Sequence, residues 1–200
     1  MDFLLECASA FQGLLNYQYA FVLGRKGKNT EVRLGFSETD FHHLVGLHKL
    51  KDISIARANR QQVFRDILAG RITYDTLEKS AYARESNIRL TAFRNIQNYL
   101  DGDQLVFRYD NRRRPGSSIE SDYLLKMGDD LILDISFLFI DKSDCGVFYC
   151  RSFFPMEDVD YTIGQTHYAL LKKEKINLLT GESVVQYDRL TPKQKKSGDS

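Results

Sequence analysis

The spacing of hydrophobic residues changes from helix-like to strand-like along the chain. Residues 3–15 carry large apolar side chains every three or four positions, which predicts an amphipathic helix that packs on a sheet face. Residues 17–23 and 31–36 are strand-like and flank a polar turn with two glycines, so they predict a hairpin. The basic tip of this hairpin is expected to be a solvated turn.

The middle of the chain reads as helical. Residues 60–69, 74–82 and 85–100 are polar with scattered apolar positions, and the apolar spacing in the last of these ranges favours a helix that stops at Gly102. We therefore predict a helical insertion over about residues 54–100.

From residue 104 onward, apolar and polar residues alternate. Turn signals recur every ten to fifteen positions, which is typical of an antiparallel meander. The predicted strands are 104–109, 121–127, 130–140, 147–154 and 165–172, followed by a hairpin over 176–187. The predicted fold class is α+β, with the N-terminal helix packed on an antiparallel β-sheet.

Composition limits the organisation of the chain. Its 200 residues, 42% of them hydrophobic, suit one domain over residues 1–190. Residues 191–200 contain three lysines and no large apolar residue, so we predict a disordered tail. The net charge of +1 gives no global basic field, so any nucleic-acid contact must rest on a local patch. No apolar run is long enough to cross a bilayer and no leader is recognisable, so we expect a cytoplasmic protein without a membrane partner.

The cysteines predict neither a disulfide framework nor a structural zinc site. Cys7, Cys145 and Cys150 are odd in number and lack paired CxxC spacing, so we expect reduced thiols that pack in the core. We predict no metal and no cofactor, because the histidines lack the spacing of a helical metal pair.

Three of the four histidines fall in residues 36–48, where chemistry is most expected. Ser37 can cap a helix there and Asp40 can complete a capping box. His43 is the candidate of interest, whereas His42 and His48 are expected to be exposed surface residues.

Four strings together resemble a known family. They are Phe41–Leu47 (FHHLVGL), Arg151–Pro155 (RSFFP), Tyr161–Gln165 (YTIGQ) and Leu171–Asn177 (LKKEKIN). The chain resembles a phage-associated group of nuclease-like domains in the superfamily of barnase, EndoU, the colicin tRNases and RelE, over most of residues 15–187. The resemblance implies an N-terminal helix, a four-stranded antiparallel sheet and metal-independent ribonuclease activity.

Cleavage of RNA by its own 2′-hydroxyl needs a base, an acid and donors that stabilise the phosphorane. His43 is the preferred catalytic residue because it matches the family-like string and because Gly46 leaves room beside the helix for a substrate. The alternative is a histidine at the start of a helix that hydrogen-bonds the backbone.

The second half of the chain offers partners for His43. Arg151 and Ser152 alternate on a strand, so only one of them is expected to face a cleft and contact phosphate. His167 is a candidate acid/base partner, with a half-solvated strand position as the alternative. The candidate substrate-binding residues around it are Thr162, Gln165 and Lys172.

A run of arginines over residues 108–114 is the densest positive segment. Arg108, Arg112 and Arg113 are candidates for phosphate contacts, and Tyr109 for stacking on a base. The alternatives are a solvated loop, or pairing with the acidic stretch 120–134 to form a protein-contact surface.

Two classes of function remain open from the sequence. One is an RNA-cleaving enzyme that leaves 2′,3′-cyclic phosphate, such as a toxin or phage-related effector. The other is an inactive relative that binds nucleic acid or protein, and a DNA-binding accessory protein is a weaker third. RNA is the expected partner, and an antitoxin or immunity protein is implied only by the resemblance. Convergence of the candidate side chains on one phosphate-sized site would favour the enzyme.

Overall fold

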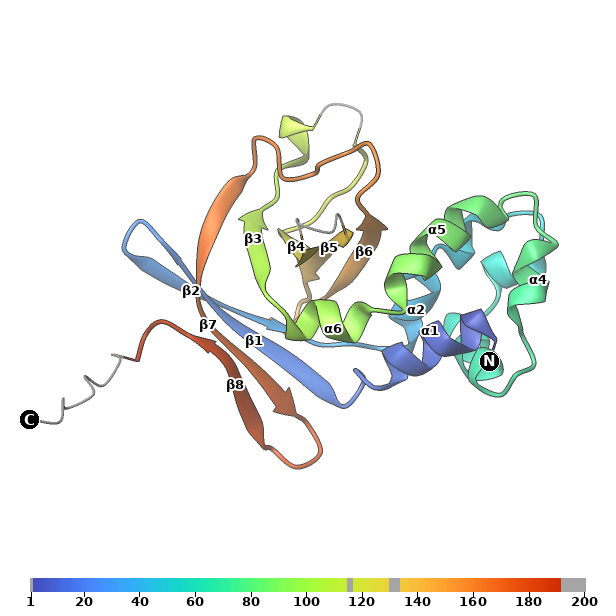
Figure 1. Ribbon diagram of the computed structural model, residues 1–200, viewed down its shortest axis with the longest axis horizontal. Helices are drawn as coiled ribbons and strands as arrows, with labels where there is room; N and C mark the ends of the chain where they lie inside the picture. Colours follow the sequence, from blue (N-terminus) through green and yellow to red (C-terminus); the bar gives the residue numbers. More distant parts are fainter. Residues whose placement is uncertain (1, 115–116, 130–133, 192–200) are drawn as a thin grey trace, which may run out of the picture.

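The computed structural model describes residues 2–114, 117–129 and 134–191 and places the helices on one side of a curved sheet (Figure 1). The helices are α1 (Phe3–Gln12), α2 (Glu38–Leu44), α3 (Arg60–Leu68), α4 (Tyr74–Glu78), α5 (Ala83–Phe93) and α6 (Ile96–Asp101), with 3-10 turns η1 (Leu47–Lys49), η2 (Ser54–Arg57) and η3 (Asn111–Arg113). The strands are β1 (Tyr17–Arg25), β2 (Lys28–Leu34), β3 (Gln104–Arg108), β4 (Tyr123–Asp129), β5 (Asp134–Lys142), β6 (Phe148–Pro155), β7 (Thr166–Asn177) and β8 (Ser183–Asp188).

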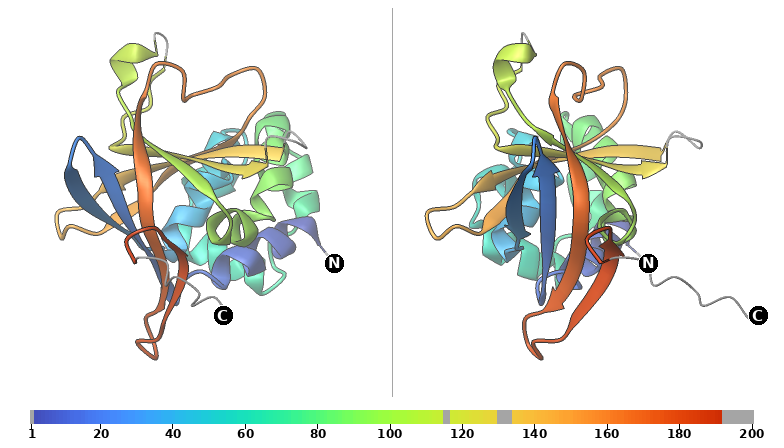
Figure 2. Two further views of the ribbon diagram at one scale, coloured as in Figure 1. Left: turned by 60° about the vertical axis from the view of Figure 1, so that its left-hand side comes forward. Right: turned by 90° about the vertical axis from the view of Figure 1, so that its left-hand side faces the viewer.

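The sheet closes on itself instead of forming an open antiparallel meander. Its strand order is β1-β2-β6-β5-β4-β3-β7-β8, and β7 also pairs with β1, so the first seven strands of this order form a barrel. The β7–β8 ribbon extends from the barrel, as the turned views show (Figure 2). The expected four-stranded antiparallel meander is not confirmed, because the sheet has eight strands and β2 meets β6 in parallel, at Leu34 and Phe148. The α+β class is confirmed.

Most predicted elements occur near their expected bounds, although several differ in length. The predicted helix 85–100 is two helices, α5 and α6, and the strand predicted to end at residue 172 continues to Asn177 as β7. Residues 130–133 of a predicted strand and 192–200 of the predicted tail lie outside the described residues.

Helix α1 packs among helices and not on a sheet face. Asp2 caps it by accepting a hydrogen bond of 3.0 Å from the Leu5 N–H. Its buried Phe11 ring lies 5.8–6.1 Å from the rings of four phenylalanines, which are Phe36, Phe41, Phe64 and Phe93. Phe93 in turn meets Phe153 of β6 edge-to-face at 5.2 Å. This aromatic cluster joins the helical layer to the barrel.

The β4–β5 ribbon has a core on each face because successive side chains point in opposite directions. Leu125 and Leu138 pack in the larger core with the helices, whereas Leu124, Phe137 and Phe139 pack in a smaller one. Cys7 and Cys150 are buried but Cys145 is exposed, so the expectation of core packing is wrong for Cys145. None of the helices that the structure describes combines the length and apolar character needed to cross a membrane.

Replacement of Phe93 by alanine should lower the free energy of unfolding by about 3–5 kcal/mol, because it leaves a cavity between the helices and β6. Urea denaturation measures this loss. Leu179→Ala is the control, since Leu179 is 75% exposed and should change stability by about 0.5 kcal/mol or less. A Phe93→Ala protein as stable as the parent would contradict the role assigned to the aromatic cluster.

Candidate functional site

Helix α2 begins with the predicted capping box. The Ser37 N–H donates to Asp40 Oδ2 at 2.9 Å, and Ser37 Oγ accepts from the Thr39 N–H at 3.4 Å. The helix stops at Leu44 and does not continue to His48, because Gly46 takes a left-handed conformation with φ +81°. This turn brings His48 back onto His43, with ring centroids 4.1 Å apart and planes within 14°.

Two expectations about the residues around His43 are wrong. His42 is 1% exposed, with Nε2 2.9 Å from the Ile55 carbonyl oxygen, so it is not a surface residue. His48 is half-buried and not exposed. The space beside Gly46 holds Arg89 and not a substrate, since a Cβ at Gly46 would lie 3.2 Å from Arg89 Cδ.

A β-bulge in β6 places Arg151 and Ser152 on the same cavity. Ser152 pairs with Phe139 and Cys150 with the next residue, Ile140, so Arg151 has no partner across the ladder. An extra residue of this kind breaks the strict alternation of a strand and redirects side chains. The expectation that only one of the two residues could line a cleft is therefore wrong.

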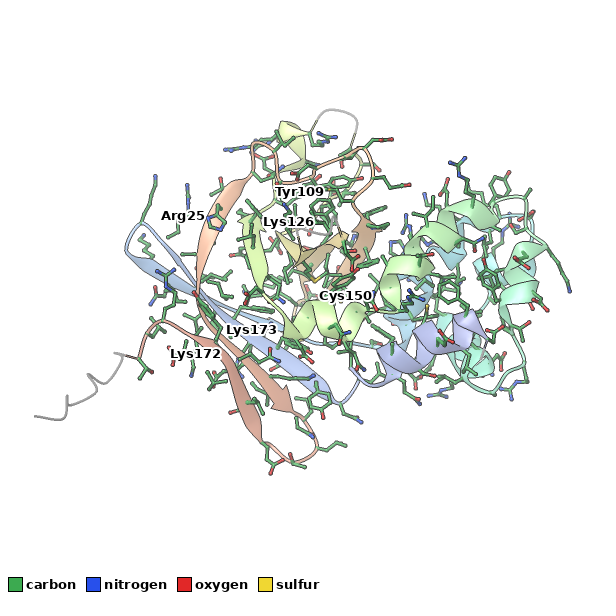
Figure 3. All side chains as sticks on the ribbon, in the orientation of Figure 1. Arg25, Tyr109, Lys126, Cys150, Lys172 and Lys173 are labelled. Carbon is green, nitrogen blue, oxygen red and sulfur yellow. The ribbon has the colours of Figure 1, made fainter. Side chains whose placement is uncertain are left out.

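The central cavity lies between β6 and the helical layer, which includes α2, and has a volume of about 420 Å³. It contains three of the four predicted catalytic residues, His43, Arg151 and Ser152. Cys150, on β6 facing the helices, also lines it (Figure 3). Among the wall residues that the sequence analysis did not assign to the site are the acidic, basic and imidazole side chains of Asp40, His48, Lys49, Arg60, Arg89 and Glu120.

Four cations surround the two stacked histidines. Lys49, Arg60, Arg89 and Arg151 make no ion pair within the described ranges. Arg89 is only 7% exposed, and its guanidinium carbon lies 4.3 Å from the Phe154 ring centre. Because these four cations outnumber the carboxylates of Asp40 and Glu120 in the same cavity, the cavity favours binding of an anion.

The same surroundings keep both imidazoles neutral. Burial, followed by the charges of Arg60, Arg89 and Arg151, lowers the pKa of His43 to about 4. Burial, followed by His43 and Arg89, lowers the pKa of His48 to about 3. At neutral pH the His43 ring can therefore accept a proton.

Asp40 shows the opposite shift in the same cavity. Burial raises the pKa of its carboxyl to about 6, although the Ser37 N–H and the charge of Arg60 act against the rise. Asp40 and His43 are three residues apart and share a face of α2. In the described ranges no group of three or more His, Cys, Asp or Glu side chains is placed to hold a metal ion.

His167 and the residues predicted to bind substrate around it lie apart from the central cavity. His167 is exposed on β7, with its ring 5.2 Å from that of Phe107. Lys172 forms an ion pair of 3.0 Å with Glu174 and lies far from Cys150 in Figure 3. Thr162 donates to Asp160, and the Gln165 side chain bonds both backbone groups of Asp110, so these two residues order loops.

The arginine run lines a second hollow of about 480 Å³ that shares Glu120 with the central cavity. The positive charges of these arginines are largely compensated. Arg108 pairs with Asp122 at 2.7 Å, Arg112 pairs with Asp110 at 2.9 Å, and Arg113 donates to the Gly164 carbonyl at 2.7 Å. Tyr109 is 4% exposed and packs against Phe139, so it has no free face on which a base could stack.

Comparison with family models decides the classification of the chain. Residues 4–190 match the model described as phage-Barnase-EndoU-ColicinE5/D-RelE like nuclease 4. The chain belongs to this family. The resemblance read from the four strings is thus confirmed, and it places the central cavity in a phage-related nuclease-like protein. Neither the curated proteins nor the solved structures contain a significant match.

The imidazole of His43 should remain neutral down to about pH 4, because the cavity resists its protonation. An NMR titration of the histidine ring protons measures this pKa. Added inorganic phosphate should raise the pKa of His43, since a bound anion offsets the nearby cations. A His43 pKa near 6.5 without phosphate would contradict the described electrostatics.

The lowered pKa of His43 also predicts how stability depends on pH. Below about pH 6.5 the unfolded chain binds a proton at this histidine that the folded protein does not bind until about pH 4. The parent should therefore lose stability relative to His43→Gln as the pH falls from 7 to 5. Urea midpoints of both proteins at the two pH values measure the difference. Asp40, whose pKa is also shifted, is present in both proteins and therefore does not account for a difference between them. A parallel decline of the two midpoints would argue against the shift.

Proposed function

We propose that the protein is a metal-independent endoribonuclease that cleaves RNA by transesterification and leaves a 2′,3′-cyclic phosphate. The observation that carries the proposal is the meeting of neutral His43 in one cavity with Arg60, Arg89 and Arg151, which form no ion pair among the residues that the structure describes. Membership of a nuclease-like family supports the same reaction class. RNA supplies its own nucleophile, so acid, base and charge stabilisation suffice for the reaction.

In the proposed mechanism the scissile phosphate binds among the arginines of the central cavity. Arg151 and Arg89 hold its nonbridging oxygens, and the Ser152 hydroxyl donates to one of them. His43 takes the proton of the 2′-hydroxyl as the 2′-oxygen forms its bond to phosphorus. The bond from phosphorus to the 5′-oxygen breaks, and the protonated Asp40 carboxyl donates its proton to that leaving oxygen.

Substrate binding itself adjusts the two proton-transfer groups. A phosphodiester anion offsets the surrounding cations, so it raises the pKa of both His43 and Asp40. His43 becomes a stronger base, and more Asp40 carries the proton needed by an acid. Two groups whose pKa values are shifted in opposite directions by one site are typical of an acid–base pair.

The second hollow offers a path for the rest of the strand. Arg108, Arg112 and Arg113 would lie beside the backbone of an RNA that leaves the central cavity past Glu120. Because these arginines already have partners, their contribution would be positioning more than affinity.

One observation favours a second candidate function, a phosphate-binding module without catalysis. With a pKa of about 4, His43 is a weak base in the empty cavity. If a bound phosphate fails to raise this pKa, the cavity would retain RNA without cleaving it.

Purified protein incubated with cellular RNA in EDTA should give fragments that end in 2′,3′-cyclic phosphate. His43→Ala should abolish cleavage, and Arg151→Ala should slow it about 10²-fold or more because the phosphorane loses a donor. Arg84→Ala, at an exposed position on α5 outside the central cavity, and His167→Gln are the controls and should cleave like the parent. Equal cleavage by parent and His43→Ala would overturn the site assignment. RNA binding that depends on Arg151, without cleavage, would establish the binding module instead.

The pH dependence of cleavage should be bell-shaped with a mildly acidic optimum. The acidic limb follows protonation of His43, and the alkaline limb follows loss of the Asp40 proton. Asp40→Asn keeps an oxygen that can cap the helix but has no proton to donate, so it should slow cleavage about 10²-fold or more and remove the alkaline limb. Asp75→Asn, exposed on α4, is the matched control. An unchanged profile in Asp40→Asn would exclude Asp40 as the acid.

A further inference from the structure

A smaller cavity adjoins the central one and shares two wall residues with it, Arg89 and Phe154. This side cavity has a volume of about 260 Å³ and lies between α5 and the segment that follows β6. We propose that it binds the nucleobase next to the scissile phosphate. The inference rests on the proposed function, because it assigns the substrate of the central cavity to a phosphate with a base beside it.

Five of the nine residues that line the side cavity are apolar or aromatic. Ile88, Pro155 and Val159 line it together with the rings of Phe154 and Tyr161. These two rings stack on each other with centroids 5.7 Å apart and planes at 28°. Apolar side chains and ring edges of this kind suit a planar heterocycle, which packs against them by van der Waals and edge-to-face contacts.

The charges of the two cavities differ in a way that separates phosphate from base. The side cavity has three exposed carboxylates, those of Glu85, Glu157 and Asp158, and none forms an ion pair in the part of the chain described. Carboxylates repel a phosphate but accept hydrogen bonds from the N–H groups of a base. The cationic central cavity therefore suits the phosphate, and the side cavity suits the uncharged base.

Arg89 connects the two cavities. It is more than nine-tenths buried, stacks on Phe154, and has no carboxylate partner among the described side chains. Its guanidinium can donate to a phosphate oxygen in the central cavity. Its stack on Phe154 forms part of the wall of the side cavity. A phosphate and its neighbouring base are similarly adjacent, so one nucleotide step fits two cavities with a common wall.

The test is equilibrium binding of three 2′-deoxy dinucleotides, which lack the nucleophile and so are not cleaved through it. One carries both bases, one lacks the 5′ base and one lacks the 3′ base. The parent should bind the complete ligand about tenfold more tightly than the abasic ligand that lacks the base recognised by the side cavity. Tyr161→Ala should abolish this difference and leave the dissociation constant of that abasic ligand unchanged. Tyr82→Ala, at a ring 48% exposed outside both cavities, is the matched control.

Equal binding of all three ligands by the parent would overturn the proposal, as would a Tyr161→Ala variant that weakens all three equally. If Tyr161→Ala does not fold, the double variant Glu157→Gln, Asp158→Asn replaces it, since both positions are exposed. It should weaken only the ligands that carry the recognised base, by about three- to tenfold.

Cleavage of RNA by the parent, measured separately, keeps the two proposals distinguishable. Cleavage together with base-independent binding would refute only the base site, whereas base-dependent binding without cleavage would refute only the ribonuclease.

Discussion

The edge-to-face contact between Phe93 and Phe153 helps to hold the two halves of the candidate site together. Phe93 lies within the aromatic cluster that fixes α2, and Phe153 is next to the bulge of β6. His43 comes from the first of these elements and Arg151 from the second. Because proton transfer and charge stabilisation depend on placement to within about 1 Å, this packing supports the chemistry without touching it.

The cavity departs from the usual rules of protein interiors. Buried cations are normally paired, yet Arg89 has no carboxylate partner within the described chain, and His42 Nδ1 is buried with no hydrogen-bond partner there. Groups of this kind lower stability, and they tend to persist where function needs them. An excess of positive charge, neutral imidazoles and a carboxyl with a raised pKa together form a site that favours an anion.

Much of the fold could be predicted from the sequence because local patterns record local structure. The alternation of apolar and polar residues predicted the approximate position of the strands, and Ser37 with Asp40 predicted the start of α2. The closure of the sheet could not be predicted in this way, since pairing of β1 with β7 is a long-range event that leaves no periodic signal. The bulge at Arg151 is equally hidden, because one extra residue in a strand does not alter its composition. Gly46 indicates in the sequence that the chain can turn and bring His48 back onto His43. The presence of Arg89 in the cavity could not be predicted, because it depends on how α5 packs against β6.

The closure of the barrel also determines when the surroundings of the central cavity are complete. Helix α2 leaves the ribosome early, but the cavity is incomplete until β6 has followed, and the barrel cannot close before β7 meets β1. Such long-range pairing is slow compared with helix formation. Under the proposed ribonuclease function, this order of assembly would keep a partly made chain from cutting the message that encodes it.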